Sequence, residues 1–153
     1  MIGPDRPGGP PGPTAHALRL LVGYDGSEAS YRAVQWALRI ARWGGAAVFV
    51  VHAATAPPTV MEPRTDEEQF SEVDAIGGTL RDFMADAARD GIQLEAGSRE
   101  GPPVEVLLAA ADEVHADWIL VGTRGLRGAS RALLGSVSGA LVERARLPVT
   151  VVP

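Results

Sequence analysis

Apolar and polar positions alternate along this chain in two different periods. Five short apolar runs are separated by longer stretches in which apolar residues recur every three or four positions. A short apolar run bounded by turn residues is typical of a buried strand, and the longer period is typical of one face of a helix. The apolar runs predict strands over residues 18–23, 47–53, 92–98, 118–122 and 148–152. The run over 92–98 alternates more than the others, as expected for a strand nearer the edge of a sheet.

Helical spacing predicts one helix in each interval between these strands. Ser27 is suited to be the N-cap of the first helix, and Gly44 with Gly45 ends it. A long loop over residues 54–71 precedes the second helix, whose first half is weakened by two adjacent glycines. The predicted helices cover about residues 28–43, 73–90, 103–114 and 136–146.

Strands that alternate with crossover helices define the fold class. They predict a single doubly wound α/β domain, similar in layout to Rossmann and flavodoxin folds, with a five-stranded parallel sheet and about four helices. Ligands of such sheets bind at the carboxyl ends of the strands, at the point where the strand order reverses. We therefore expect the functional site at that edge.

The first 17 residues differ in composition from the rest of the chain. Residues 3–13 contain nine Gly or Pro without a strict three-residue period, which predicts a flexible or polyproline-like tail over residues 1–17 and a folded domain over 18–153. The tail has neither a cationic start nor an apolar segment, so it does not resemble a signal peptide. No run approaches the length of a membrane span, and the expected location is the cytoplasm.

Composition also narrows the chemistry. The chain has no cysteine and no lysine, and its net charge is −5. The absence of lysine excludes Schiff-base chemistry and a P-loop lysine, so a bound phosphate must be held by backbone amides, hydroxyls or arginine. We expect no metal site, since thiolates are missing and the three histidines lack ligand spacing. The negative charge argues against nucleic acid as a partner.

A glycine-rich loop follows the fourth predicted strand and leads into the last helix. It reads G-T-R-G-L-R-G-A-S-R-A-L-L-G-S-V-S, which is G-x2-G-x9-G-S. Gly122, Gly125 and Gly135 are expected to permit positive φ and to let a phosphate or ribose approach the backbone.

The start of the last helix supplies the donors. The amides of Ser136, Val137 and Ser138 are first-turn groups at the positive end of the helix dipole, and the two serine hydroxyls are expected to add donors. Taken singly, each of these glycines and serines could serve the turn or cap the helix alone. Together, between a strand and a helix, they favour an anion site.

At these residues the sequence resembles the universal stress protein family, specifically its ATP-binding branch. The resemblance covers residues 18–153, and it rests on V-G-Y-D-G-S from Val22, V-V-H-A from Val50, and V-G-T-R-G…L-L-G-S-V-S from Val121. In that family, G-x2-G-x9-G-[ST] separates the members that bind ATP from those that do not.

The resemblance implies roles for individual residues. Asp25 matches the acid that holds the ribose hydroxyls, Ala53 lies where backbone groups meet the adenine edge, and Gly122 matches a ribose contact. The implied cofactor is ATP, with or without magnesium. The implied binding residues are Asp25, Ala53, Val121, Gly122, Gly125, Gly135, Ser136, Val137 and Ser138.

The resemblance also implies a homodimer that pairs through the last strand, Val149 to Val152, and a nucleotide-dependent regulator of the stress response. No general base is evident beside the phosphate loop, so at most weak ATP hydrolysis is expected. A slow ATPase, or a binder of AMP or a cyclic nucleotide, remains an alternative, because the loop indicates phosphate and not the number of phosphates.

Several side chains near the expected site have open roles. Tyr24 would narrow the pocket or stack on the ligand, and His52 is expected to be a hydrogen-bonded core or rim histidine and not a catalyst. The loop arginines are either surface charge or a clamp on the β- and γ-phosphates: Arg124, Arg127 and Arg131. The tryptophans are expected in the core or at an interface: Trp36, Trp43 and Trp118.

Overall fold

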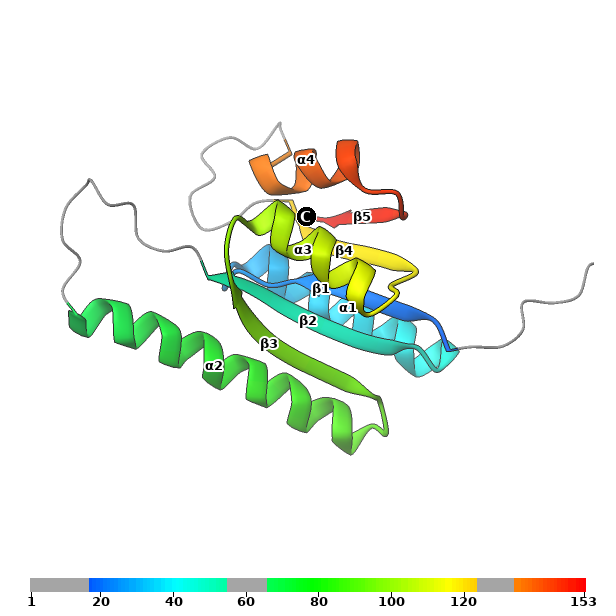
Figure 1. The fold of residues 1–153 in the computed structure, drawn as a ribbon. Helices are drawn as coiled ribbons and strands as arrows, with labels where there is room; N and C mark the ends of the chain where they lie inside the picture. The colour runs from blue at the N-terminus through cyan, green and yellow to red at the C-terminus, as the bar shows by residue number, and fades with distance from the viewer. Residues whose placement is uncertain (1–16, 55–65, 124–133) are drawn as a thin grey trace, which may run out of the picture.

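A computed structural model of the chain describes residues 17–54, 66–123 and 134–153, with the side chains of 66–74 excepted. Strands and helices alternate strictly through these residues (Figure 1). The elements are β1 (Arg19–Gly23), α1 (Glu28–Gly44), β2 (Ala47–Ala54), α2 (Asp66–Arg89), β3 (Leu94–Glu100), α3 (Pro103–Glu113), β4 (Trp118–Gly122), α4 (Ser136–Arg144) and β5 (Val149–Val152).

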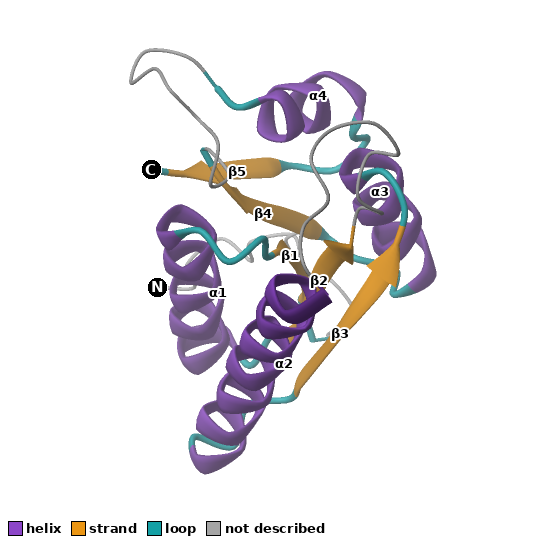
Figure 2. Cartoon of the chain, turned by 90° about the vertical axis from the view of Figure 1, so that its left-hand side faces the viewer, coloured by secondary structure: helices purple, strands orange, loops and turns teal. Residues whose placement is uncertain are grey.

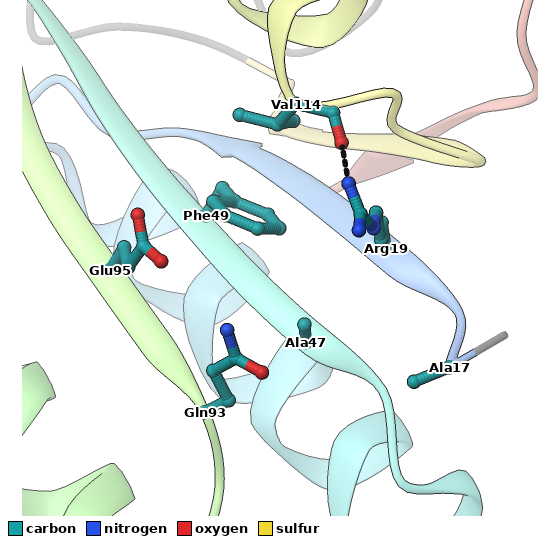
Figure 3. A pocket seen from close by; sticks show the side chains of 7 residues that line it. All are labelled: Ala17, Arg19, Ala47, Phe49, Gln93, Glu95 and Val114. Atoms are coloured by element: carbon teal, nitrogen blue, oxygen red, sulfur yellow. Dashed lines mark hydrogen bonds between the residues drawn. The ribbon is translucent and has the colours of Figure 1, made fainter.

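The five strands form one parallel sheet in the order β3-β2-β1-β4-β5, which confirms the predicted doubly wound α/β fold. Helices α1 and α2 cover one face of the sheet, and α3 and α4 cover the other (Figure 2). The chain winds outward from β1 to β3 and then crosses back to β4. The strand order therefore reverses between β1 and β4, and the alternating strand β3 is an edge strand, as predicted.

Alternate residues of the inner strands β1, β2 and β4 fill two separate cores. In β1, Leu20 and Val22 are buried under α1 and α2, whereas Leu21 is buried under α3. Burying both faces of the inner strands explains why their sequences are almost continuously apolar.

The second helix differs from the prediction. It begins at Asp66, inside the stretch expected to be a loop over 54–71, and it continues through Gly77 and Gly78 without a break. Ile76, Leu80 and Phe83 of this helix are buried against the sheet. Tertiary packing of this kind outweighs the low helix propensity of glycine. Within the described residues, no helix is both long and apolar enough to cross a membrane.

Candidate functional site

The carboxyl ends of β1 and β4 lie side by side at the point where the strand order reverses. Val22 of β1 is in register with Leu120 of β4, so the two strands end at nearly the same level. Beyond them, the Tyr24 amide donates to the Val51 carbonyl at 2.9 Å, and the Thr123 amide donates to the Val152 carbonyl at 2.8 Å. The loops that carry the predicted site residues therefore start from one edge, as the sequence predicts.

The loop after β1 holds Asp25 in a fixed place. One carboxylate oxygen of Asp25, Oδ1, accepts the Ser27 amide at 3.0 Å, and the Asp25 amide donates to Ser30 Oγ at 3.3 Å. Ser27 is the N-cap of α1, as predicted, because its Oγ accepts the Ser30 amide at 3.1 Å. Gly26 has φ 84°, which permits the turn between them. Asp25 is half-buried and keeps its second oxygen, Oδ2, outside these bonds.

Ser30 is a positioning residue that the sequence analysis missed. It is 2% exposed, and its hydroxyl donates to the Ser27 carbonyl at 2.9 Å while accepting from Asp25. The available signal was a serine on the inner face of α1, where the helical period requires an apolar residue.

Gly122, at the end of β4, packs directly against the start of α1. A Cβ on Gly122 would lie 2.7 Å from the Ser30 amide nitrogen and 2.8 Å from the Ala29 carbonyl carbon. Gly122 and Gly135 are not among the described glycines with positive φ. The positive φ expected from the sequence is therefore wrong for both. Close approach of backbone to backbone explains the glycine at position 122.

Thr123 joins the two ends of the glycine-rich loop. Its carbonyl accepts the Gly135 amide at 2.7 Å and the Ser138 hydroxyl at 3.0 Å, so the chain returns at Gly135 to the point that it left. Ser138 is 2% exposed, and its hydroxyl is also 3.1 Å from the Gly135 carbonyl. The proton of this hydroxyl is used inside the turn, and the expected role of the hydroxyl toward a ligand stays a prediction. Thr123 itself was overlooked within the motif.

The N-terminus of α4 carries no side-chain cap. Gly135 is the N-cap residue, with φ −63° and ψ 163°, and it supplies no capping hydrogen bond. The first N–H groups of a helix have no acceptor within the helix, so they face outward at its positive end. Ser136 is exposed and Val137 is half-buried at this end.

Ala53 lies in the part of β2 that continues beyond the end of β1. Gly23 is in register with Val51, and β2 continues to Ala54. The Val51 carbonyl points toward β1, since it accepts the Tyr24 amide. Backbone groups of alternate strand residues point the same way, so those of Ala53 face the space past the end of β1.

Tyr24 does not enter the candidate site. It is 7% exposed, and its ring meets Phe83 of α2 edge to face, with centroids 5.4 Å apart at 89°. The expectation that it narrows the pocket or stacks on a ligand was wrong. Burial raises the pKa of the Tyr24 phenol above its ordinary value; the Thr79 hydrogen bond opposes this rise, and the charges of Asp25 and Tyr31 add to it.

His52 lies at the rim, as predicted. Its ring Nδ1 is 2.9 Å from the Tyr24 carbonyl, which only accepts, so Nδ1 is assigned the proton. The remaining predicted residue, Gly125, lies outside the described residues, as do the loop arginines Arg124, Arg127 and Arg131. Where the structure describes the chain, no group of three or more metal-ligating side chains comes together.

The fold and this edge define a doubly wound α/β protein with its candidate site at the switch point. The sequence model of the universal stress protein family matches residues 17–153. The chain therefore belongs to the universal stress protein family.

Individual relatives support this family assignment. A universal stress protein of Thermus aquaticus is 35% identical over 87% of this chain and 96% of its own length. One of Methanocaldococcus jannaschii is 31% identical over 88% of this chain and 81% of its own length. Among solved structures, a universal stress protein in complex with cAMP is 31% identical, covers 91% of this chain and 98% of its own, and has a TM-score of 0.65.

Proposed function

We propose that this chain binds an adenine nucleotide, with ATP as the preferred ligand, and acts as a dimeric, nucleotide-dependent regulator of the stress response. The observation that carries the proposal is the N-terminus of α4, which has no side-chain cap and is held at the end of β4 by Thr123.

This helix end supplies the phosphate contacts. The amides of Ser136, Val137 and Ser138 begin α4 at the positive end of its dipole, a position that suits an anion. The chain has no lysine, so backbone amides must do most of this work. Gly125, in the loop, completes the proposed phosphate cradle as the family motif implies.

The neighbouring strand ends supply the ribose and base contacts. Asp25 is anchored through Oδ1, which leaves Oδ2 to accept a hydrogen bond from a ribose hydroxyl. The backbone groups of Ala53, past the end of β1, are placed for the adenine edge. Val121 and Gly122 bring the backbone of β4 close to the ribose between these two sites.

Adenine nucleotide as the ligand class is supported by the related structure that holds cAMP. ATP in particular is proposed from this chain's G-x2-G-x9-G-S loop, with or without magnesium. Regulation is favoured over turnover because the described hydrogen bonds at the α4 N-terminus involve Thr123, Gly135 and Ser138, none of which is a general base. The cytoplasmic location stays a prediction from the sequence.

The proposed dimer uses β5, which lies at one edge of the described sheet. The carbonyls of Pro148 and Val152 accept from β4, so alternation points the backbone groups of Val149 and Val151 outward. An outward row of this kind is suited to pairing with a second copy. The oligomeric state in solution, measured by sedimentation, tests this part of the proposal.

The test of nucleotide binding compares two glycine variants. Gly135→Glu places a carboxylate at the α4 N-terminus, where the backbone dihedrals of Gly135 suit any residue. Gly139→Glu adds the same charge about one turn further on, where a Cβ meets only Leu134 Cβ, at 3.9 Å. We would titrate each protein with ATP, AMP and cAMP by calorimetry, and identify any nucleotide released from the natural chain by mass spectrometry.

The expected result is a loss of affinity of tenfold or more in Gly135→Glu, equivalent to about 1.4 kcal/mol, with Gly139→Glu close to the natural chain. Nucleotide at 100 times its Kd would raise the stability of the natural chain by about 2.7 kcal/mol. Tighter binding of AMP or cAMP than of ATP would move the assignment to those nucleotides. No binding of any of the three by the natural chain would refute the proposal.

A further inference from the structure

Two tryptophans and an arginine form an exposed row on the outer face of α1. Trp36 is 44% exposed and Trp43 is 77% exposed, so neither belongs to the core. The Arg39 guanidinium lies between them, with its Cζ 4.5 Å from the Trp36 ring centroid and 5.7 Å from that of Trp43. We refer to these three residues as the Trp36–Trp43 face.

This face has the composition of a binding surface. Trp and Arg are the residue types most enriched among those that dominate binding energy at interfaces. The opposite side of α1 already packs on the sheet through residues such as Val34 and Leu38, so the fold does not account for the exposed row. Arg39 makes no ion pair within the described residues, which leaves its donors for another group.

The first residues of the chain contain prolines whose spacing is similar to that of the two tryptophans. Although Gly and Pro together have no strict period, prolines alone recur at every third position: Pro4, Pro7, Pro10 and Pro13. A polyproline II helix has three residues per turn and a rise of about 3.1 Å, so these prolines would share one edge at intervals of about 9 Å. Trp36 and Trp43 are seven residues apart on a helix, which is about 10.5 Å along its axis.

The point where this segment enters the fold is close to the exposed row. The Ala47 amide donates to the Leu18 carbonyl at 2.8 Å, which places Leu18 beside the start of β2. Trp43 lies at the C-terminal end of α1 and precedes Ala47 by only four residues. Pro13 precedes Leu18 by five residues, a reach of about 17 Å when extended. The segment is therefore long enough to lie along α1.

We propose that residues 4–13 dock as a polyproline II helix on the Trp36–Trp43 face of their own chain. Proline rings would pack on the two indoles, and Arg39 would donate to backbone carbonyls, which a polyproline II helix leaves without internal hydrogen bonds. Residues 1–16 lie outside both the described structure and the family match, and the docking does not depend on nucleotide binding.

Tethering makes this contact measurable even when its intrinsic affinity is low. A short flexible linker gives a tethered partner an effective concentration in the millimolar range. A contact with a millimolar dissociation constant would then be occupied in about half of the molecules. Acrylamide quenching of tryptophan fluorescence reports this occupancy, because docking shields the two exposed indoles.

The experiment uses the full chain with Trp118→Phe, which leaves Trp36 and Trp43 as the only fluorophores of their kind. Deletion of residues 1–16 should raise the quenching constant by up to about twofold, as expected when docking shields both indoles in half of the molecules. A matched pair of proline variants then tests the periodicity. Pro10→Ala should raise quenching in the same direction, whereas Pro11→Ala, off the three-residue repeat, should leave it near the full-chain value.

Equal quenching with and without residues 1–16 would overturn the proposal. Equal effects of Pro10→Ala and Pro11→Ala would overturn the periodic contact. Protection that grows with protein concentration would mean that a second copy covers the face, which also contradicts docking within one chain. If Trp118→Phe does not fold, the same comparisons are made in the natural background, where the half-buried Trp118 adds a constant contribution.

Discussion

Replacement of Gly122 by alanine separates packing from ligand contact in the middle of the candidate site. The new Cβ would lie 2.7 Å from the Ser30 amide nitrogen, 2.8 Å from the Ala29 carbonyl carbon and 2.9 Å from Ala29 Cβ. Two of these atoms belong to the backbone of the first turn of α1, and the third is fixed to it. No change of rotamer can relieve the overlap, so α1 and β4 must move apart.

The expected cost follows from this geometry. Overpacking that forces backbone shifts costs about 1–3 kcal/mol. In a domain of this size each kcal/mol lowers the Tm by about 2–4 °C, so we expect a fall of roughly 2–12 °C. Urea and thermal unfolding of the nucleotide-free protein would measure the change, with an unchanged m-value as the sign that only stability is affected.

Gly97→Ala is the matched control. Gly97 lies in the edge strand β3 without a positive φ, and a Cβ there would meet nothing within 4 Å. The free energy of unfolding should change by less than about 0.5 kcal/mol. If Gly122→Ala is as stable as the natural chain but loses nucleotide, position 122 requires glycine for the ligand and the packing argument is refuted.

Two further predictions concern Tyr24 and the β5 edge. Because the pKa of Tyr24 is raised, the folded state keeps this phenol protonated at a pH where the unfolded chain has ionised it; stability is then lost as the pH rises above about 10. The free energy of unfolding, measured by urea titration, should fall less in Tyr24→Phe than in the natural chain as the pH is raised from neutral to above about 10. An equal fall in the two proteins would contradict the buried phenol. Val151→Pro removes an outward amide of β5, so sedimentation should show a shift from dimer to monomer; an unchanged dimer would exclude pairing through this edge.

The fold could be predicted from the sequence because strand and helix periods are distinct here. The nine elements follow from apolar spacing, and caps such as Ser27 and Gly45 mark helix ends that the structure confirms. The start of α2 was not predicted, since residues 66–72 are acidic or polar apart from Phe70. One apolar residue in seven gives too little hydrophobic pattern to mark the start of a helix.

The location of the candidate site was predictable, but the direction of single side chains was not always inferred correctly. Tyr24 directly follows β1, and it shares the core under α1 and α2 with Leu20 and Val22. Continuing the two-residue alternation of β1 would have placed Tyr24 in that core. The error came from treating Tyr24 as a loop residue, although its amide still pairs with Val51 as a strand residue would.

The structure also gives different physical reasons for different residues of the glycine-rich motif. Gly122 is required by contact with α1, and the Ser138 hydroxyl is required by Thr123, so the fold alone explains both. Gly135 is different, because its dihedrals suit any residue and a serine there could cap α4. Glycine forgoes that hydrogen bond at a cost of a few tenths of a kcal/mol, and leaves the first-turn amides of α4 open. The backbone conformation does not require glycine here, whereas an anion bound at those amides would favour it, which is why position 135 is the place to test the nucleotide proposal.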